Sequence, residues 1–168
     1  MTELNLLKLI CAAAVLAWVS GCVTDEPRKA DIPPQPDNAR PTTVQVVAGN
    51  PRDTNGNGYI DSVGVTVFLW DEMRSPIPLA LPGQFVFELK KTDGTDLGRW
   101  EFDETRTATA MVRRSAGPAY IFELSILGQA SDKVDSQQVD LGATFRPKSG
   151  EVVRSAAGTG LRFGKTGT

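Results

Sequence analysis

The chain contains no histidine, and this absence excludes several kinds of chemistry. Most zinc sites use histidine as a ligand, and Ser-His or Cys-His catalysis requires it as the base. Hydrolysis by a pair of carboxylates remains open, because the chain has 20 acidic residues. No motif places any two of these acids in a catalytic pair, so an enzyme is not expected.

A strong charge of either sign is also missing. The 18 basic and 20 acidic residues give a net charge of -2. A surface this close to balance offers no broad electrostatic attraction to a polyanion. Nucleic acid is therefore not expected among the partners.

The N-terminus has an apolar run, Leu9 to Val19, that is too short to span a bilayer as a helix. Its length suits the core of a signal peptide. The run ends in Val19-Ser20-Gly21-Cys22, which resembles the lipobox of bacterial lipoproteins. The resemblance implies that residues 1–21 are cleaved and that Cys22 is lipidated. The alternatives are an ordinary cleavable signal and an N-terminal anchor helix.

Lipid on Cys22 would make the membrane a partner of this chain. Each buried methylene contributes about 0.8 kcal/mol, and stable anchoring needs two or more acyl chains. In the lipoprotein family, Asp directly after the Cys tends to retain the protein at the inner membrane. Val23 stands there in this chain. The resemblance therefore implies a location in the cell envelope, at the outer membrane rather than the inner one.

The two cysteines leave no intramolecular disulfide under this interpretation. Cys11 departs with the signal peptide, and the sulfur of Cys22 carries lipid. The export route would permit disulfides, but the mature chain has no pair to form one. The folded part must therefore be stabilised by a hydrophobic core.

Residues 22–42 are expected to be the lipidated Cys followed by a tether. Residues 23–42 hold five of the 11 prolines and almost no large apolar side chains. Proline-rich chain favours an extended form, and these residues would reach roughly 60 Å. Residues 43–168 then remain as a single domain.

From Thr43 onward the apolar residues recur with a period of two, which is typical of β-strands. The clearest strands are predicted at residues 43–47, 62–70, 85–90, 99–102, 120–126 and 139–145. Residues 105–114 are a weaker candidate strand, and short strands are predicted at 151–154 and 161–163. No stretch of the domain has helical periodicity, and Asp93-Gly94 is a strong hairpin signal. The sequence therefore predicts an all-β antiparallel β-sandwich of seven to nine strands, immunoglobulin-like in general architecture.

The stretch "DTNGNGYID", residues 53–61, places oxygen-bearing side chains at alternate positions around two glycines. It resembles the calcium loop of EF-hands, dockerins and thrombospondin type 3 repeats. Calcium prefers six to eight hard oxygen ligands. The resemblance implies that a weakly bound calcium ion is held by the side chains of Asp53, Asn55, Asn57 and Asp61 and by the carbonyl of Tyr59.

The loop departs from this family at its twelfth position. The family has a bidentate Glu there, and this chain has Gly64. A further ligand must come from water or from elsewhere in the chain, with Asp71, Glu72 and Asp93 as candidates. The alternative is a tight turn without metal, because Asn-Gly favours hairpins and Asp and Asn close turns on their own backbone.

These features together predict an envelope-anchored lipoprotein whose calcium-stabilised sandwich is a binding or structural module. Its candidate partners are an envelope protein or a glycan. One alternative is a carboxylate-dependent hydrolase of cell-envelope glycans. Another is a dockerin-like partner site, although a dockerin has two such loops with helices and this chain has one loop.

Overall fold

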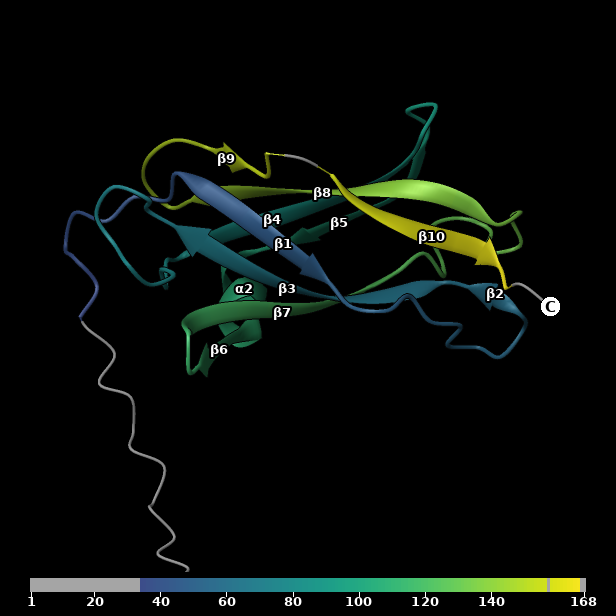
Figure 1. Ribbon diagram of the computed structural model, residues 1–168, viewed down its shortest axis with the longest axis horizontal. Helices are drawn as coiled ribbons and strands as arrows, with labels where there is room; N and C mark the ends of the chain where they lie inside the picture. The colour runs from purple at the N-terminus through teal and green to yellow at the C-terminus, as the bar shows by residue number, and fades with distance from the viewer. Residues whose placement is uncertain (1–33, 157, 167–168) are drawn as a thin grey trace, which may run out of the picture. The chain divides into compact units, whose positions relative to one another are not determined.

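The computed structural model describes residues 34–156 and 158–166 (Figure 1). The predicted signal peptide, the lipobox with Cys22 and the first part of the tether lie outside these residues. Within the described residues, no helix has both the length and the apolar character needed to cross a membrane.

The described residues form ten strands and one short helix. In chain order they are β1 (Thr43–Ala48), β2 (Tyr59–Ile60), β3 (Ser62–Trp70), β4 (Gly83–Lys91), β5 (Asp96–Phe102), α2 (Glu104–Ala110), β6 (Met111–Arg114), β7 (Gly117–Ser125), β8 (Gln137–Pro147), β9 (Val153–Arg154) and β10 (Thr159–Lys165).

The strands make two antiparallel sheets whose apolar faces share one core (Figure 1). The first sheet has the strand order β1-β3-β7-β6, and the second has the order β2-β10-β8-β4-β5 with β9 paired to β8. The predicted all-β antiparallel sandwich is confirmed. The number of strands exceeds the predicted range by one. The additional strand is β2, which was not predicted because it is only two residues long and shows no hydrophobic period.

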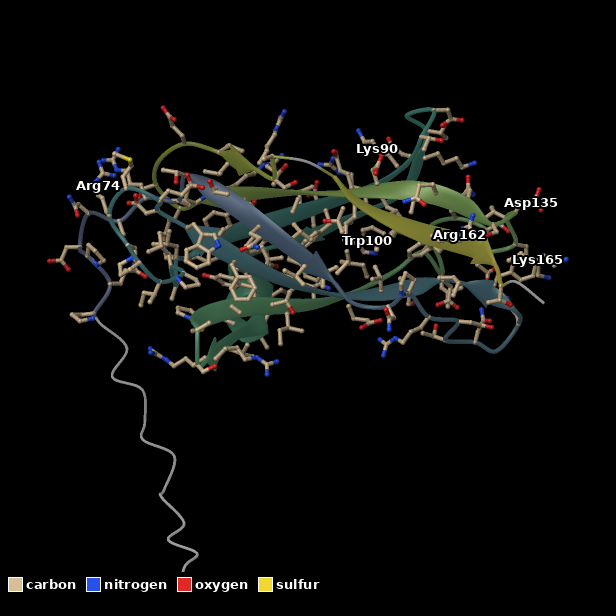
Figure 2. All side chains as sticks on the ribbon, in the orientation of Figure 1. Arg74, Lys90, Trp100, Asp135, Arg162 and Lys165 are labelled. Carbon is tan, nitrogen blue, oxygen red and sulfur yellow. The ribbon has the colours of Figure 1, made fainter. Side chains whose placement is uncertain are left out.

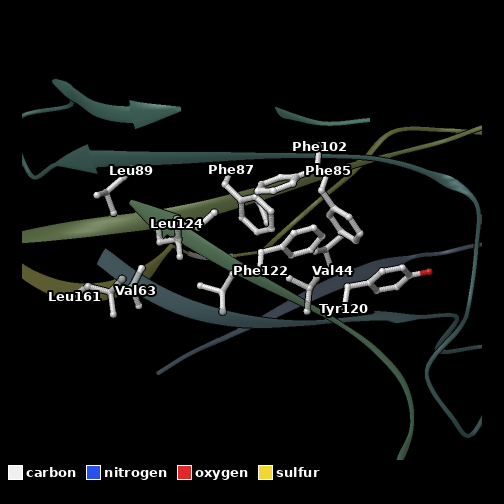
Figure 3. Packing of buried hydrophobic residues seen from close by; sticks show 14 of the residues in the cluster. Val44, Val63, Phe85, Phe87, Leu89, Phe102, Tyr120, Phe122, Leu124 and Leu161 are labelled. Atoms are coloured by element: carbon white, nitrogen blue, oxygen red, sulfur yellow. The ribbon is translucent and has the colours of Figure 1, made fainter. Parts of the chain in front are cut away.

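The alternating runs point their apolar residues inward as the period of two predicts. One half of the core is a cluster of aromatic rings, seen in Figure 3, with the ring centroids of Phe102 and Phe122 4.4 Å apart and those of Phe85 and Phe145 4.8 Å apart. The other half is aliphatic and includes Val63.

The prediction of a strand over residues 105–114 is wrong in its first part, where the chain forms helix α2. The side chain of Asp103 caps this helix by accepting a hydrogen bond from the backbone N–H of Arg106 at 2.8 Å. Thr107 is the buried residue of this helix, and its hydroxyl donates to the carbonyl of Phe102. The cap and this buried contact override the strand preference of the threonines. Only Met111–Arg114 is a strand.

In the predicted strand 99–102, Trp100 and Phe102 alternate with Arg99 and Glu101, and this alternation predicts that both rings face the core. Trp100 is only half-buried. It lies on β5, which is an edge strand of the second sheet. Its indole N–H donates to the carbonyl of Ser125 at the end of β7, 3.0 Å away. Trp100 therefore joins the two sheets at their edge and does not fill the centre.

The described chain begins beside the C-terminal end of β3. The N–H of Thr42 donates to the carbonyl of Trp70 at 2.7 Å, and the N–H of Arg40 donates to the carboxylate of Asp71 at 3.1 Å. Asp71 is fully buried, and the hydrogen bond from Arg40 is the main cause of the lowered pKa of its carboxyl. These contacts attach the residues just before β1 to the domain.

Candidate metal site

The loop of residues 53–61 lies between β1 and β3, and it contains β2. Gly56 and Gly58 have φ angles of 73° and 84°, in the left-handed region that favours glycine. This backbone turns three N–H groups toward the carboxylate of Asp53. The N–H groups of Gly56 and Gly58 each donate to it at 2.7 Å, and that of Asn57 donates at 3.2 Å.

The two asparagines of the loop also bind its backbone. The amide oxygen of Asn55 accepts from the N–H of Asn57 at 3.1 Å, and the amide oxygen of Asn57 accepts from the N–H of Tyr59 at 3.0 Å. These are the hydrogen bonds by which Asn closes a turn on its own backbone. Taken alone, they fit a metal-free turn as well as a metal loop.

Asp61 is fully buried at the end of the loop. Its carboxylate accepts from the hydroxyl of Thr54 at 2.6 Å and from the N–H of Thr54 at 3.1 Å. Burial raises the pKa of Asp61, but the hydrogen bonds from Thr54 and Ser62 outweigh burial and hold this pKa below its usual value. Asp61 is therefore an ionised carboxylate inside the protein at neutral pH.

A further acid, Asp132, meets the loop and was not among the predicted ligands. It lies in the connection between β7 and β8, and only 9% of its surface is exposed. One of its oxygens accepts from the side-chain amides of both Asn55 and Asn57, at 2.9 and 2.7 Å. The amide of Asn55, followed by that of Asn57, lowers the pKa of the Asp132 carboxyl.

Asp132 has no local signal in the sequence, because 77 residues separate it from Asn55. Strand pairing brings the two together. The start of β3 pairs with the end of β7, with Ser62 opposite Ser125, so the chain that leaves β7 passes the loop that precedes β3. The pairing of β3 with β7 therefore places the residues that follow residue 126 next to the loop, and Asp132 is one of them.

Two further contacts fasten the loop to the domain. The N–H of Ile126 donates to the carbonyl of Asp61 at 2.9 Å, and the N–H of Thr166 donates to the carbonyl of Gly58 at 2.8 Å. Lys165 at the end of β10 lies opposite Tyr59. In Figure 2, Asp135 and Lys165 lie at the end of the sandwich that carries β2, and Arg74 lies at the opposite end.

Two of the other acids considered as ligands, Asp71 and Glu72, lie away from the loop. Asp71 and Glu72 follow the C-terminal end of β3, whereas the loop precedes its start. A strand of 9 residues spans about 30 Å. Asp93 lies in the turn between β4 and β5, where it accepts from the N–H of Thr95 at 2.8 Å. Asp71 and Glu72 are therefore too distant to complete this site.

The donor set at the loop fits a hard cation in its chemistry. Three carboxylates, two side-chain amides and a backbone carbonyl are oxygen ligands of the kind that calcium prefers. Across residues 34–156 and 158–166, no three His, Cys, Asp or Glu side chains are arranged to hold a metal by themselves. A metal here would therefore need the amide and carbonyl oxygens together with the carboxylates.

Comparisons with protein-family models and with curated proteins find no match to this chain. A functional proposal therefore rests on the residues of this chain alone.

Proposed function

We propose that this protein is a lipid-anchored lipoprotein of the cell envelope whose β-sandwich binds calcium at one end and serves as a binding or structural module. The anchor is supported by the Val19 to Cys22 motif. The calcium site is supported by the spacing of residues 53–61 and by the acid that meets them from the β7–β8 connection.

The observation that carries the calcium proposal is a set of three carboxylates that make no ion-pair contact with a cation. Asp53 is half-buried, Asp61 and Asp132 are buried, and hydrogen bonds link all three to the same loop. None of them forms an ion pair with a described Lys or Arg. Buried charges are normally paired or coordinate a metal. A bound cation would supply a counter-charge for these three carboxylates.

In this proposal Asp132 is the acid that replaces the missing Glu at Gly64. The loop would contribute the side chains of Asp53, Asn55, Asn57 and Asp61 and the carbonyl of Tyr59. The amides of Asn55 and Asn57 now donate N–H groups to Asp132, so both would rotate to present oxygen to the metal. The ion would then link the loop to the β7–β8 connection.

Calcium at this site would stabilise the domain modestly. Two asparagines in place of carboxylates reduce the ligand charge, so the expected affinity is in the extracellular range of about 10⁻⁴–10⁻³ M. At ten times Kd, binding contributes about 1.4 kcal/mol to the free energy of unfolding. Magnesium should substitute poorly, because it requires a tighter octahedron and retains its water ligands.

Calorimetry with millimolar calcium, combined with melting curves in chelator, tests the metal site. We expect heat on binding, a melting temperature several degrees lower in chelator, and loss of both responses in Asp53→Ala. Asp135→Ala is the matched control, because Asp135 is an exposed acid near the loop and should respond to calcium as the unmodified chain does. Absence of both heat and a melting shift in the unmodified chain would leave the loop as a metal-free turn.

Cell fractionation of Cys22→Ser tests the anchor separately. The variant should remain uncleaved or become soluble, because its hydroxyl cannot accept the thioether-linked lipid. A processed Cys22→Ser chain that still sediments with membranes would contradict the lipoprotein proposal.

A further inference from the structure

The outer face of the second sheet carries a groove of about 510 Å³. This volume lies in the range of small-molecule sites, about 300–1,000 Å³. We call it the arginine groove. Its floor and walls include Val86, Arg99, Gly142, Thr144, Arg146 and Arg154. It lies apart from the candidate metal site, since none of the residues of the 53–61 loop lines it.

The register of the strands brings two of these arginines together. Arg154 on β9 lies directly opposite Thr144 on β8, and Arg146 is two residues further along β8 on the same face. Diagonal neighbours on one face of a sheet are about 7–8 Å apart, within reach of long side chains. Arg146 and Arg154 therefore lie side by side with like charge.

Two carboxylates near the groove, those of Glu88 and Glu101, form ion pairs with its third arginine, Arg99. Arg99 pairs with Glu101 at 2.7 Å and also with Glu88. Neither Arg146 nor Arg154 forms an ion pair or a side-chain hydrogen bond with another residue in the part of the chain that the structure describes. These two positive charges therefore have no carboxylate in direct contact, and the acid near Arg146 is Glu101, which Arg99 already binds and whose pKa Arg146 also lowers.

The floor of the groove is open at Gly142. A Cβ atom added there would meet only the carbonyl oxygen of Glu88, at 4.0 Å, so packing does not require glycine at this position. Glycine inside a strand often marks a place where a ligand approaches the backbone closely. Beside it, Val86 is an apolar residue only 3% exposed and Thr144 supplies a hydroxyl group.

We propose that the arginine groove binds a small molecule that carries an oxyanion, either a carboxylate or a phosphate, held between Arg146 and Arg154. The planar guanidinium group binds both kinds of oxyanion through two parallel hydrogen bonds. The anion would neutralise two neighbouring like charges, and the uncharged remainder of the ligand would lie over Val86 and Gly142. This binding requires neither calcium nor the lipid anchor.

Calorimetry of the purified full chain in calcium-free, low-salt buffer tests the proposal with three sugars of similar size. Glucose 6-phosphate and glucuronate each carry one of the two oxyanions, and glucose carries none. We expect at least one of the two anions to bind and glucose to bind at least tenfold more weakly. The anion that binds more tightly identifies the oxyanion that the groove prefers.

Three variants and one control assign the binding to the groove. Arg146→Gln and Arg154→Gln should each weaken the affinity at least fivefold. Gly142→Val should weaken it to the same degree while leaving every charge in place, because its side chain occupies the floor. Arg162→Gln removes an exposed arginine from β10 on the same sheet (Figure 2) and should leave the affinity within twofold.

Two results would overturn the proposal. One is the absence of binding of both anions to the unmodified chain. The other is binding that Gly142→Val and Arg146→Gln leave unchanged, or that Arg162→Gln weakens equally, since attraction to diffuse surface charge would then explain it.

Discussion

The aromatic half of the core and the loop end of the sandwich are stabilised in different ways. In the aromatic half, rings from β4, β5, β7 and β8 pack against one another, and their attraction is largely non-directional. At the loop end, hydrogen bonds with defined directions converge on Asp53, Asp61 and Asp132. The first region depends on apolar area, and the second depends on the ionisation and placement of three carboxylates. One domain therefore contains two regions that should respond to different perturbations.

The largest expected effect is in the aromatic half. Phe122 contacts the rings of Phe85, Phe87 and Phe102, with centroids 5.3, 5.1 and 4.4 Å away. Phe122→Ala should lower the free energy of unfolding by about 3–5 kcal/mol in denaturant titrations. Ile121→Ala, next to it on the exposed face of β7, should cost less than about 1 kcal/mol. Equal losses of unfolding free energy in the two variants would contradict the assignment of Phe122 to the inner face of β7 and of Ile121 to its outer face.

Trp100→Ala should have a smaller effect than Phe122→Ala, because Trp100 is only half-buried. We expect a loss below about 3 kcal/mol, the lower bound for fully buried aromatic residues. Trp100→Phe retains most of the ring but loses the hydrogen bond to the carbonyl of Ser125. This hydrogen bond contributes about 1 kcal/mol to the free energy of unfolding. A loss from Trp100→Ala as large as that from Phe122→Ala would place the indole among the core rings.

At the loop end, Asp132→Asn should abolish the stabilisation by calcium, about 1.4 kcal/mol at ten times Kd. Asp135→Asn, three residues along the same connection, should retain it. Phe122→Ala should also retain the full calcium shift of the melting temperature, because its ring lies in the other region. A calcium shift that persists in Asp132→Asn while Asp53→Ala loses it would show that the loop binds calcium without Asp132.

The smallest expected difference is in the response to pH. The pKa values of Asp61 and Asp132 are lowered in the folded state. Both carboxyls therefore stabilise the fold fully above the unfolded value of about 3.9, and this stabilisation is lost as the pH falls through the folded values. Melting temperatures measured from pH 6 downward should fall less steeply for Asp132→Asn than for the unmodified chain. The slope for Phe122→Ala should be unchanged, and a flattened slope in that variant would contradict the separation of the two regions.

The sequence by itself determined most of the sandwich. The period of two in runs such as 120–126 and 139–145 depends only on which residues are apolar, because successive side chains of a strand point to opposite faces. These runs became β7 and β8 with their apolar residues inside. The turn at the glycines of the 53–61 loop could also be predicted from the sequence, since a left-handed turn favours glycine whatever surrounds it.

Only the tertiary structure decided the features that depend on distant partners. Residues 104–110 are a helix because Asp103 caps it and its own residue Thr107 is buried against the domain, although threonine favours strands. Trp100 is half-buried because its strand lies at an edge, and strand order cannot be read from periodicity. Asp132 reaches Asn55 and Asn57 because β7 pairs with β3, and Arg154 lies diagonally across from Arg146 because β9 pairs with β8. Hydrophobic period is a local property of the chain, whereas the neighbours of a polar side chain are set by strand pairing across long separations.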